Sequence, residues 1–232
     1  MKRRTLRFKL IAGGCLVVLL PLVVVGFIAE IKVSQTLEAE AGRQMLTLAN
    51  ANARMVEMTL STELKAIEQI AASPILTEAT IAARQGSSTG DYGNALGTVL
   101  NSIRQKRSDD YVSLLVIDKD GKFLSDSHEG ALKGISLNHK DVFREVVMGK
   151  AMIGDAVKSE VSGNSVLYLM APVTASGGEV FGVLAIQYSL THLNRAITNK
   201  HGKTGYGFGL DHSGRNVLHP DSQRVLADNF YQ

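Results

Sequence analysis

The chain has no tryptophan, one cysteine and four prolines among its 232 residues. The lone Cys15 excludes a disulfide within the chain, so cysteine usage indicates nothing about an oxidising compartment. Aromatic residues make up only 6% of the sequence, and no basic stripe interleaves with them, which excludes a nucleic-acid-binding protein. Charged residues amount to 20% and apolar residues to 45%. That balance excludes a disordered chain.

The motifs of catalysis and metal binding are also missing. The six histidines are scattered and show no metal-ligand spacing. Residues 118–129 imitate a calcium loop, but Lys122 occupies a ligand position and Gly121 comes too early. No nucleophile elbow, phosphate-binding loop or dinucleotide fingerprint is present. The sequence therefore predicts neither an enzyme nor a cofactor.

Positive charge is concentrated at the N-terminus. Residues 1–9 hold five of the 25 basic side chains, which leaves 20 basic against 22 acidic side chains in the rest of the chain. Residues 10–29 contain no charged side chain, and about 20 apolar residues suffice for a helix to cross a bilayer. Pro21 is tolerable in such a helix. Because the basic cluster precedes the helix and only Lys32 closely follows it, we expect a cytoplasmic N-terminus in the inner (cell) membrane and a periplasmic or extracellular bulk.

A cleaved signal peptide is the alternative for the N-terminal segment, because it also begins with basic residues. Two observations oppose it. The apolar run exceeds a typical signal-peptide core, and residues 27–29 (Phe-Ile-Ala) do not form a small-residue cleavage site. We therefore predict an uncleaved, single-pass anchor.

A long helix is predicted after the anchor. Residues 31–72 contain no proline and only one glycine. Apolar side chains recur at steps of three and four, which is the helical period. The narrow stripe, rich in alanine and methionine, suits either a homodimer seam or packing on the chain's own domain. Ser73 and Pro74 end the helix, and Pro74 suits the first turn of the next one.

The apolar period changes to that of β-strands from Tyr111 onward. After two further helices at 75–84 and 96–107, we expect strands and helices in the order of an α+β domain. The predicted strands are 112–117, 122–125, 153–157, 166–173 and 180–188, and the predicted helices are 141–148 and 190–200. This order, with an antiparallel sheet and helices on its faces, is the PAS-like plan and leaves room for a ligand cavity.

One hairpin motif occurs twice. Residues 115–124 and 208–217 each consist of an apolar run, an Asp, two turn residues, a Gly, and a second apolar run. Glycine supplies the positive φ that a tight turn requires. The aspartates of the two copies, Asp118 and Asp211, are 93 residues apart. This spacing indicates two sheet domains in tandem. Only residues 218–232 follow the second copy, so we expect its lobe to be incomplete.

Several further stretches carry a family resemblance, in order and with consistent spacing. They are residues 134–143, 167–173, 182–186, 202–208 and 219–221. Together they resemble the double Cache sensor region of bacterial transmembrane receptors, most of all methyl-accepting chemotaxis proteins.

The resemblance implies a domain division. Residues 1–9 form a cytoplasmic segment, 10–29 the transmembrane helix, and 30–73 the long extracytoplasmic helix. Residues 74–198 then form the membrane-distal Cache lobe, and 199–232 begin the membrane-proximal lobe.

The resemblance also implies ligand-binding positions. In relatives that bind amino acids, an Arg and aromatic residues hold the carboxylate, and an Asp takes the amine. Those positions correspond here to Lys140, to Val142 with Phe143, and to Gln187. Lys140 attracts an anion without the guanidinium fork, and Gln187 offers an ammonium group no charge. A small organic anion is therefore the favoured ligand, with Lys140, Phe143, Tyr168 and Gln187 as the binding residues; a solvated Lys140 and a core Phe143 are the alternative.

The resemblance implies the ligand-sensing part of a chemotaxis receptor. The alternative is the sensor region of a histidine kinase or diguanylate cyclase. A third interpretation is a stand-alone anchored binding protein, which an incomplete second lobe opposes.

Overall fold

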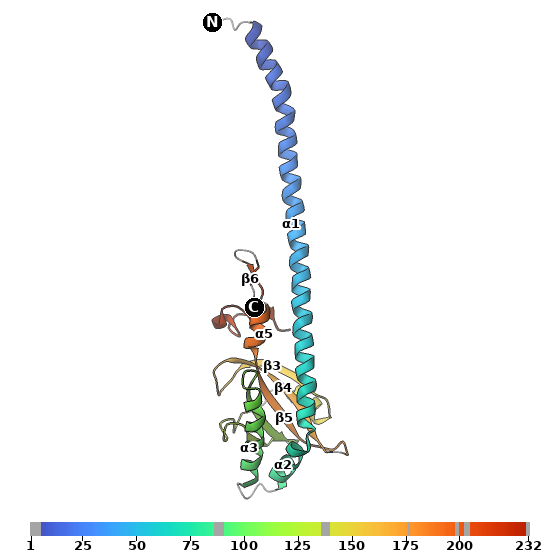
Figure 1. Cartoon of the computed structure of the whole chain (residues 1–232), viewed down its shortest axis with the longest axis vertical. Helices are drawn as coiled ribbons and strands as arrows, with labels where there is room; N and C mark the ends of the chain where they lie inside the picture. Colours follow the sequence, from blue (N-terminus) through green and yellow to red (C-terminus); the bar gives the residue numbers. More distant parts are fainter. Residues whose placement is uncertain are drawn as a thin grey trace. The chain divides into compact units, whose positions relative to one another are not determined.

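The computed structural model describes residues 6–85, 91–135, 140–175, 177–197, 200–201 and 205–230. The chain divides into two compact units, Met1–Arg54 and Met55–Gln232. The element order is drawn in Figure 1.

Helix α1 (Leu6–Ala71) is continuous over 66 residues and contains Pro21. It joins the two helices that the sequence predicts at 10–29 and 30–73, because no helix-breaking residue separates them. Within the part of the chain that the structure describes, no helix meets the length and hydropathy that a membrane crossing requires. The predicted helix end is confirmed, since α1 stops at Ala71 and α2 starts at Pro74.

The second unit is built around one antiparallel sheet with the strand order β2-β1-β5-β4-β3. Its strands are β1 (Tyr111–Asp118), β2 (Phe123–Asp126), β3 (Met152–Lys158), β4 (Ser165–Thr174) and β5 (Val180–Ser189). All five predicted strands are present, each within about two residues of its predicted bounds. The first copy of the repeated hairpin joins β1 to β2, and a further hairpin joins β4 to β5.

One face of the sheet is covered by the end of α1 together with α2 (Pro74–Gln85) and α3 (Asp91–Lys106). Ile67, Leu76 and Leu100 from these helices are fully buried against Leu184 and Ile186 of β5. Helix α5 (Leu190–Ile197) follows β5 directly and adds Leu193 and Ile197 to the same cluster. Burial of such side chains contributes about 1.5–3 kcal/mol each.

The opposite face is covered by helix α4 (Lys140–Val147) and by the turns that follow β2. Val146 of α4 and Leu132 of those turns are fully buried against it. The sheet is therefore a middle layer, and each of its strands presents alternate side chains to two different cores.

The C-terminal part contains short strands and confirms the repeated hairpin. Its elements are β6 (Lys200–His201), β7 (Gly205–Tyr206), β8 (Gly209–Leu210), β9 (Asn216–Leu218) and a 3₁₀ turn, η1 (Ser222–Arg224). The β8–β9 turn repeats the hydrogen bonds of the β1–β2 turn. Asp118 Oδ1 accepts the backbone N–H groups two and four residues on, at 2.9 and 2.8 Å, and Asp211 Oδ1 does the same at 2.9 and 3.0 Å.

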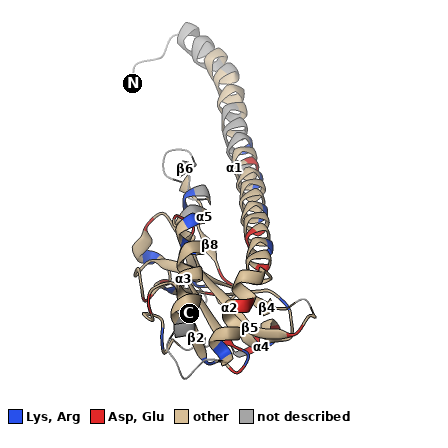
Figure 2. Ribbon diagram, turned by 60° about the horizontal axis from the view of Figure 1, so that its bottom comes forward, with Lys and Arg blue, Asp and Glu red and all other residues tan. Residues whose placement is uncertain are grey.

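The following glycines, Gly121 and Gly214, have φ values of 84° and 80°. Burial opposes ionisation of Asp211, but hydrogen bonds from Ser213 and Arg215 outweigh it and lower the pKa of Asp211 to about 2. Basic and acidic residues are interspersed over the described elements of this unit (Figure 2).

Candidate functional site

A row of buried polar side chains crosses the sheet face that lies under α4. Gln187 of β5 pairs in register with Tyr168 of β4 on one side and with Ser113 of β1 on the other. Directly opposed residues of neighbouring strands project to the same face. Gln187 and Ser113 are fully buried, and Tyr168 is 3% exposed. The structure thus brings together two of the four predicted ligand-binding residues, Tyr168 and Gln187.

The amide of Gln187 is held in one orientation by the turn after β3. Ser159 Oγ accepts the backbone N–H groups of Val161 and Ser162, each at 3.2 Å. Its own proton is therefore available to Gln187 Oε1, 2.7 Å away. With its oxygen fixed in this way, Gln187 directs its NH₂ group toward Tyr168 Oη at 2.7 Å and toward Glu160 Oε2 at 3.3 Å.

The hydroxyl of Tyr168 has a proton that it can donate to a further hydrogen bond. Because its oxygen accepts from Gln187, the phenolic proton is not used in that bond and can be donated to an acceptor. Burial raises the pKa of Tyr168, the bond from Gln187 lowers it in part, and the nearby charge of Glu160 raises it again. The hydroxyl thus stays protonated at neutral pH, as a donor to a carboxylate or carbonyl oxygen must.

Ser113 adds a second buried hydroxyl. Its Oγ has no hydrogen-bond partner in the described structure, although buried polar groups are almost always paired. It lies beside Gln187 in the register of β1 and β5. Ser113 is therefore a further candidate for contact with a ligand.

The remaining predicted residues lie on α4. Phe143 is half-buried and packs against the apolar cluster that contains Tyr168 and Met170. Val142 packs there too. Lys140 is the first residue of α4, but its side chain lies outside the described part of the structure. The predicted role of Lys140 stays a prediction.

Sequence reasoning missed Ser113, Ser159 and Glu160. The latter two follow β3 in a turn of ordinary polar composition, and Ser113 gains its neighbours only because β1 pairs with β5. A sequence pattern that alternates in period two identifies the face of Ser113 but not the strand beside it. Among the described residues, no group of three His, Cys, Asp or Glu side chains is placed to hold a metal ion.

Comparison with known proteins now bears on this site. A family model described as Cache domain matches residues 33–232, which is most of the chain. The chain belongs to the Cache domain family. No curated protein sequence matches it.

Solved structures of several sensor and ligand-binding domains are similar to this chain in fold. The sensor domain of the V. cholerae histidine kinase DctB is 16% identical, with a TM-score of 0.62 over 79% of this chain and 68% of that one. The ligand-binding domain of the Pseudomonas aeruginosa PAO1 amino acid chemoreceptor PctC, in complex with GABA, is 17% identical, with a TM-score of 0.58 over 79% and 78%. The Campylobacter jejuni chemoreceptor Tlp3, with isoleucine bound, is 19% identical, with a TM-score of 0.52 over 74% and 67%.

Behind the polar row, on the opposite face of the Cache sheet, lies a charged cluster that includes α1. Arg107 Nη2 contacts Glu63 Oε1 of α1 at 2.7 Å and Asp110 Oδ2 at 3.0 Å. Tyr111 donates to Glu63 Oε2 at 3.2 Å and accepts from Arg107 at 3.1 Å. Its ring also meets the ring of Tyr188 edge to face, with centroids 6.4 Å apart.

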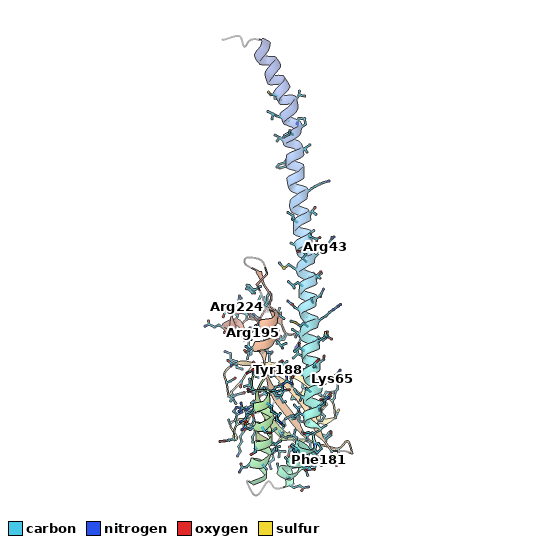
Figure 3. The ribbon with its side chains drawn as sticks, in the orientation of Figure 1. Arg43, Lys65, Phe181, Tyr188, Arg195 and Arg224 are labelled. Carbon is cyan, nitrogen blue, oxygen red and sulfur yellow. The ribbon has the colours of Figure 1, made fainter. Side chains whose placement is uncertain are left out.

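The cluster shifts the ionisation of its members. Burial opposes the charge of Arg107, but hydrogen bonds to Glu63 and Asp110 raise its pKa further above neutrality. Burial and the charges of Glu63 and Asp110 raise the pKa of Tyr188 to about 12. Tyr188, labelled in Figure 3, directly follows Gln187 on β5. Adjacent residues of one strand therefore belong to the candidate site and to the α1 cluster.

Proposed function

We propose that this chain is the extracytoplasmic ligand-sensing part of a bacterial chemotaxis receptor, and that a small molecule binds the α4-covered face of its Cache sheet. The polar row of Ser113, Gln187 and Tyr168 supports the site most directly. It combines two hydroxyl donors with an apolar surround, the usual makeup of a small-molecule pocket.

The proposed ligand carries a carboxylate. The free proton of Tyr168 and the unpaired hydroxyl of Ser113 both suit an acceptor oxygen. Lys140, the first residue of α4, adds a positive charge to the helix that covers this face of the sheet. Glu160 lies at the edge of the row, where its carboxylate suits a cationic group of the ligand. A ligand with an amino group that contacts Glu160 would be an amino acid, and one without it would be an organic acid.

The membrane and dimer roles extend the proposal. The uncharged run at residues 10–29 supports an anchor with a cytoplasmic N-terminus. In the first unit, the predicted stripe of α1 includes Leu37 and Met45, whose side chains are 64% and 55% exposed, which supports a homodimer seam. In the second unit the stripe continues through Leu60, Leu64 and Ile67, which pack against the sheet. A homodimer seam thus suits the part of α1 in the first unit, and packing on the chain's own domain suits the part in the second unit.

The alternative is a sensor region that regulates a histidine kinase or a diguanylate cyclase. The likeness to the DctB sensor domain favours the kinase. Sensor folds are shared among receptors with different output domains, so the domain encoded with the sensor distinguishes these functions.

Calorimetric titration of the purified chain with matched ligand pairs tests the proposal. Succinate with aspartate, and propionate with alanine, differ within each pair only by an amino group. We expect saturable binding of one series, and Tyr168→Phe should weaken it about tenfold to a hundredfold, because a hydrogen bond to a charged group contributes about 1.5–3 kcal/mol.

Tyr188→Phe is the matched control, since it removes the same hydroxyl from another buried tyrosine, on the opposite face of the sheet. Its affinity should equal that of the wild type. Equal affinity of Tyr168→Phe and wild type would place the ligand elsewhere, and no binding in either series would reject a carboxylate ligand.

A further inference from the structure

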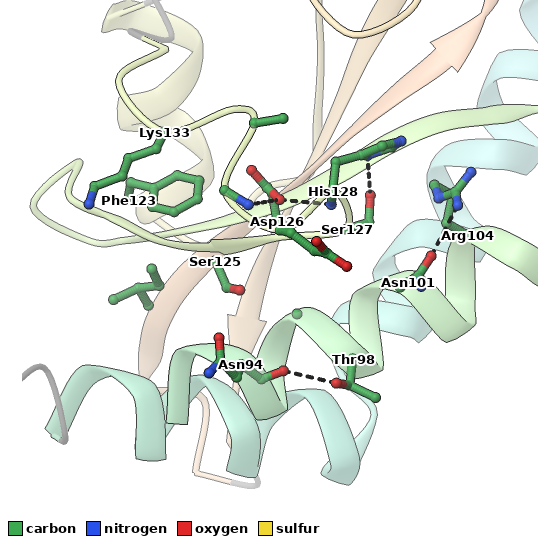
Figure 4. A pocket seen from close by; sticks show the side chains of 15 residues that line it. Asn94, Thr98, Asn101, Arg104, Phe123, Ser125, Asp126, Ser127, His128 and Lys133 are labelled. Carbon is green, nitrogen blue, oxygen red and sulfur yellow. Dashed lines mark hydrogen bonds between the residues drawn. The ribbon is translucent and has the colours of Figure 1, made fainter. Parts of the chain in front are cut away.

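A cavity lies at the edge of the same lobe, and the residues of the polar row do not line it. It has a volume of about 970 Å³ and lies between α3 on one side and β2 with its following turns on the other (Figure 4). We call it the α3–β2 groove; the polar residues of its lining that matter here are Asn101, Arg104, Asp126, Ser127, His128 and Lys133. None of the four predicted ligand-binding residues lines it.

Arg104 is the unusual residue of the α3–β2 groove. Its Nη2 donates to Asn101 Oδ1 at 3.0 Å, but its Nε is buried with no hydrogen-bond partner in the described structure. No ion pair joins Arg104 to a carboxylate of the described residues, whereas Arg107, one helical turn later, pairs with two. A half-buried guanidinium without a counter-ion is unfavourable, because burial removes hydration that no partner replaces.

The acidic residues of the groove do not fill this role. Asp126 is 1% exposed, and its oxygens accept the backbone N–H groups of His128, Gly130 and Leu132 at 2.8, 2.8 and 2.7 Å. Its charge is thus engaged by the turn. Glu129, the other acidic residue of the lining, is exposed and forms no ion pair with Arg104 within the described structure.

His128 supplies a second donor beside Arg104. Ser127 Oγ accepts the backbone N–H of Leu114 at 3.0 Å, and its own proton is available to His128 Nδ1, also at 3.0 Å. This arrangement leaves the proton of the neutral ring on Nε2, as a donor. Figure 4 shows the ring of His128 and the guanidinium of Arg104 at the same end of the groove, with Lys133 at the other end.

We propose that the α3–β2 groove binds a small oxyanion, such as a carboxylate, phosphate or sulfate, between Arg104 and His128. Arg104 contributes a permanent positive charge that no carboxylate of the described residues neutralises, and His128 contributes an N–H donor. The site is separate from the polar row under α4 and does not depend on the sensory role, so the lobe has two ligand positions.

Anion binding at this position is linked to pH. Burial and then the positive charge of Arg104 lower the pKa of His128, while Asp126 raises it in part. A bound anion offsets the charge of Arg104 and so raises the pKa of His128. Because the complex takes up a proton that the free chain does not, affinity increases as the pH falls through the pKa of His128.

NMR of the full chain in detergent, with ¹³C-labelled histidine, tests the site. Sulfate is the first probe, because it does not titrate over this pH range. We expect one histidine resonance, absent from His128→Gln, to shift saturably with an apparent dissociation constant below about 10 mM. Its pKa should rise in the presence of sulfate. Parallel titrations with phosphate and acetate rank the oxyanion classes.

Four variants make the result decisive. Arg104→Gln should weaken binding at least tenfold, and Arg104→Lys should weaken it less, because lysine keeps the charge but not the fork. Lys119→Gln, an exposed lysine outside the lining of the groove, and Tyr168→Phe, at the polar row, should bind as the wild type does. The proposal fails if sulfate shifts no histidine, or if Arg104→Gln and wild type, shown by circular dichroism to be equally folded, respond alike.

Discussion

Gly182 lies where β5 passes the end of β1, and it has no room for a side chain. A Cβ placed on it would lie 2.7 Å from the carbonyl oxygen of Ile117 and 3.3 Å from Thr80 Cγ2. The first of these atoms belongs to the backbone of a central strand and cannot move aside cheaply. We expect Gly182→Ala to lower the free energy of unfolding by about 1–3 kcal/mol, measured by urea denaturation.

Gly177 provides the comparison for Gly182. It lies in the hairpin loop before β5, and a Cβ placed there would meet nothing within 4 Å. Gly177→Ala should therefore change stability by less than about 0.5 kcal/mol. Equal effects of the two substitutions would show that close approach of β1 and β5 is not what selects glycine at 182.

Single residues differ in how far sequence alone predicts them. Tyr168 and Gln187 were identified from a family resemblance, and they are hydrogen-bonded to each other. Arg104 and His128 were not identified, because β1 separates α3 from β2 in the sequence and nothing in either segment suggests a shared groove.

At the scale of elements, the end of α1 is attached to the sheet by the charged cluster of Glu63, Arg107 and Tyr111. The side chain of Glu63 is 12% exposed, so loss of its charge leaves Arg107 with Asp110 alone. We expect Glu63→Gln to lower the free energy of unfolding by about 1–2 kcal/mol, less than a fully buried pair would lose because Arg107 is partly solvated. Hydrogen exchange should also quicken in residues 55–71.

Glu68→Gln is the control for this prediction. Glu68 lies on the same helix, five residues later, and is exposed. Its substitution should leave both the unfolding free energy and the exchange rates unchanged. If Glu63→Gln leaves exchange at residues 55–71 as slow as in the wild type, apolar packing alone holds the helix end.

Elements were predicted well where the periodic segment was long, and they were missed where it was only two residues long. The 66-residue α1 and the ten-residue β4 and β5 have clear periodicity. The two-residue strands β6 and β7 have none and were missed. Helix α3 begins at Asp91 instead of the predicted 96, because Gly93 does not interrupt it. The placement of β1 beside β5 is a tertiary property that no local pattern contains.

At the scale of the whole molecule, the predicted membrane anchor can be tested by substitution of its apolar residues. Leu19 and Leu22 lie within the uncharged run at residues 10–29 and are 58% and 67% exposed. A lysine at the centre of a membrane helix costs about 2.5–3.5 kcal/mol. We expect Leu19→Lys with Leu22→Lys to move the chain out of the membrane fraction after carbonate extraction of cells that express it.

Leu37→Lys with Leu46→Lys is the matched control. These two leucines lie on the same helix and are similarly exposed, but they lie beyond the apolar run. This variant should stay in the membrane fraction, although it is expected to weaken a dimer that forms through α1. Membrane association that persists in the Leu19 and Leu22 variant would contradict the anchor.

The position of Gln187 next to Tyr188 on β5 limits how this sensor can change during evolution. In the proposed function, a substitution at 187 that alters ligand preference also disturbs the strand that supports Tyr188, so ligand preference and the attachment of α1 to the sheet would change together. Ser159 and Glu160 escape this constraint, because they reach the site from a turn. New ligand preferences should therefore arise first in that turn and reach β5 only after compensating changes around Glu63.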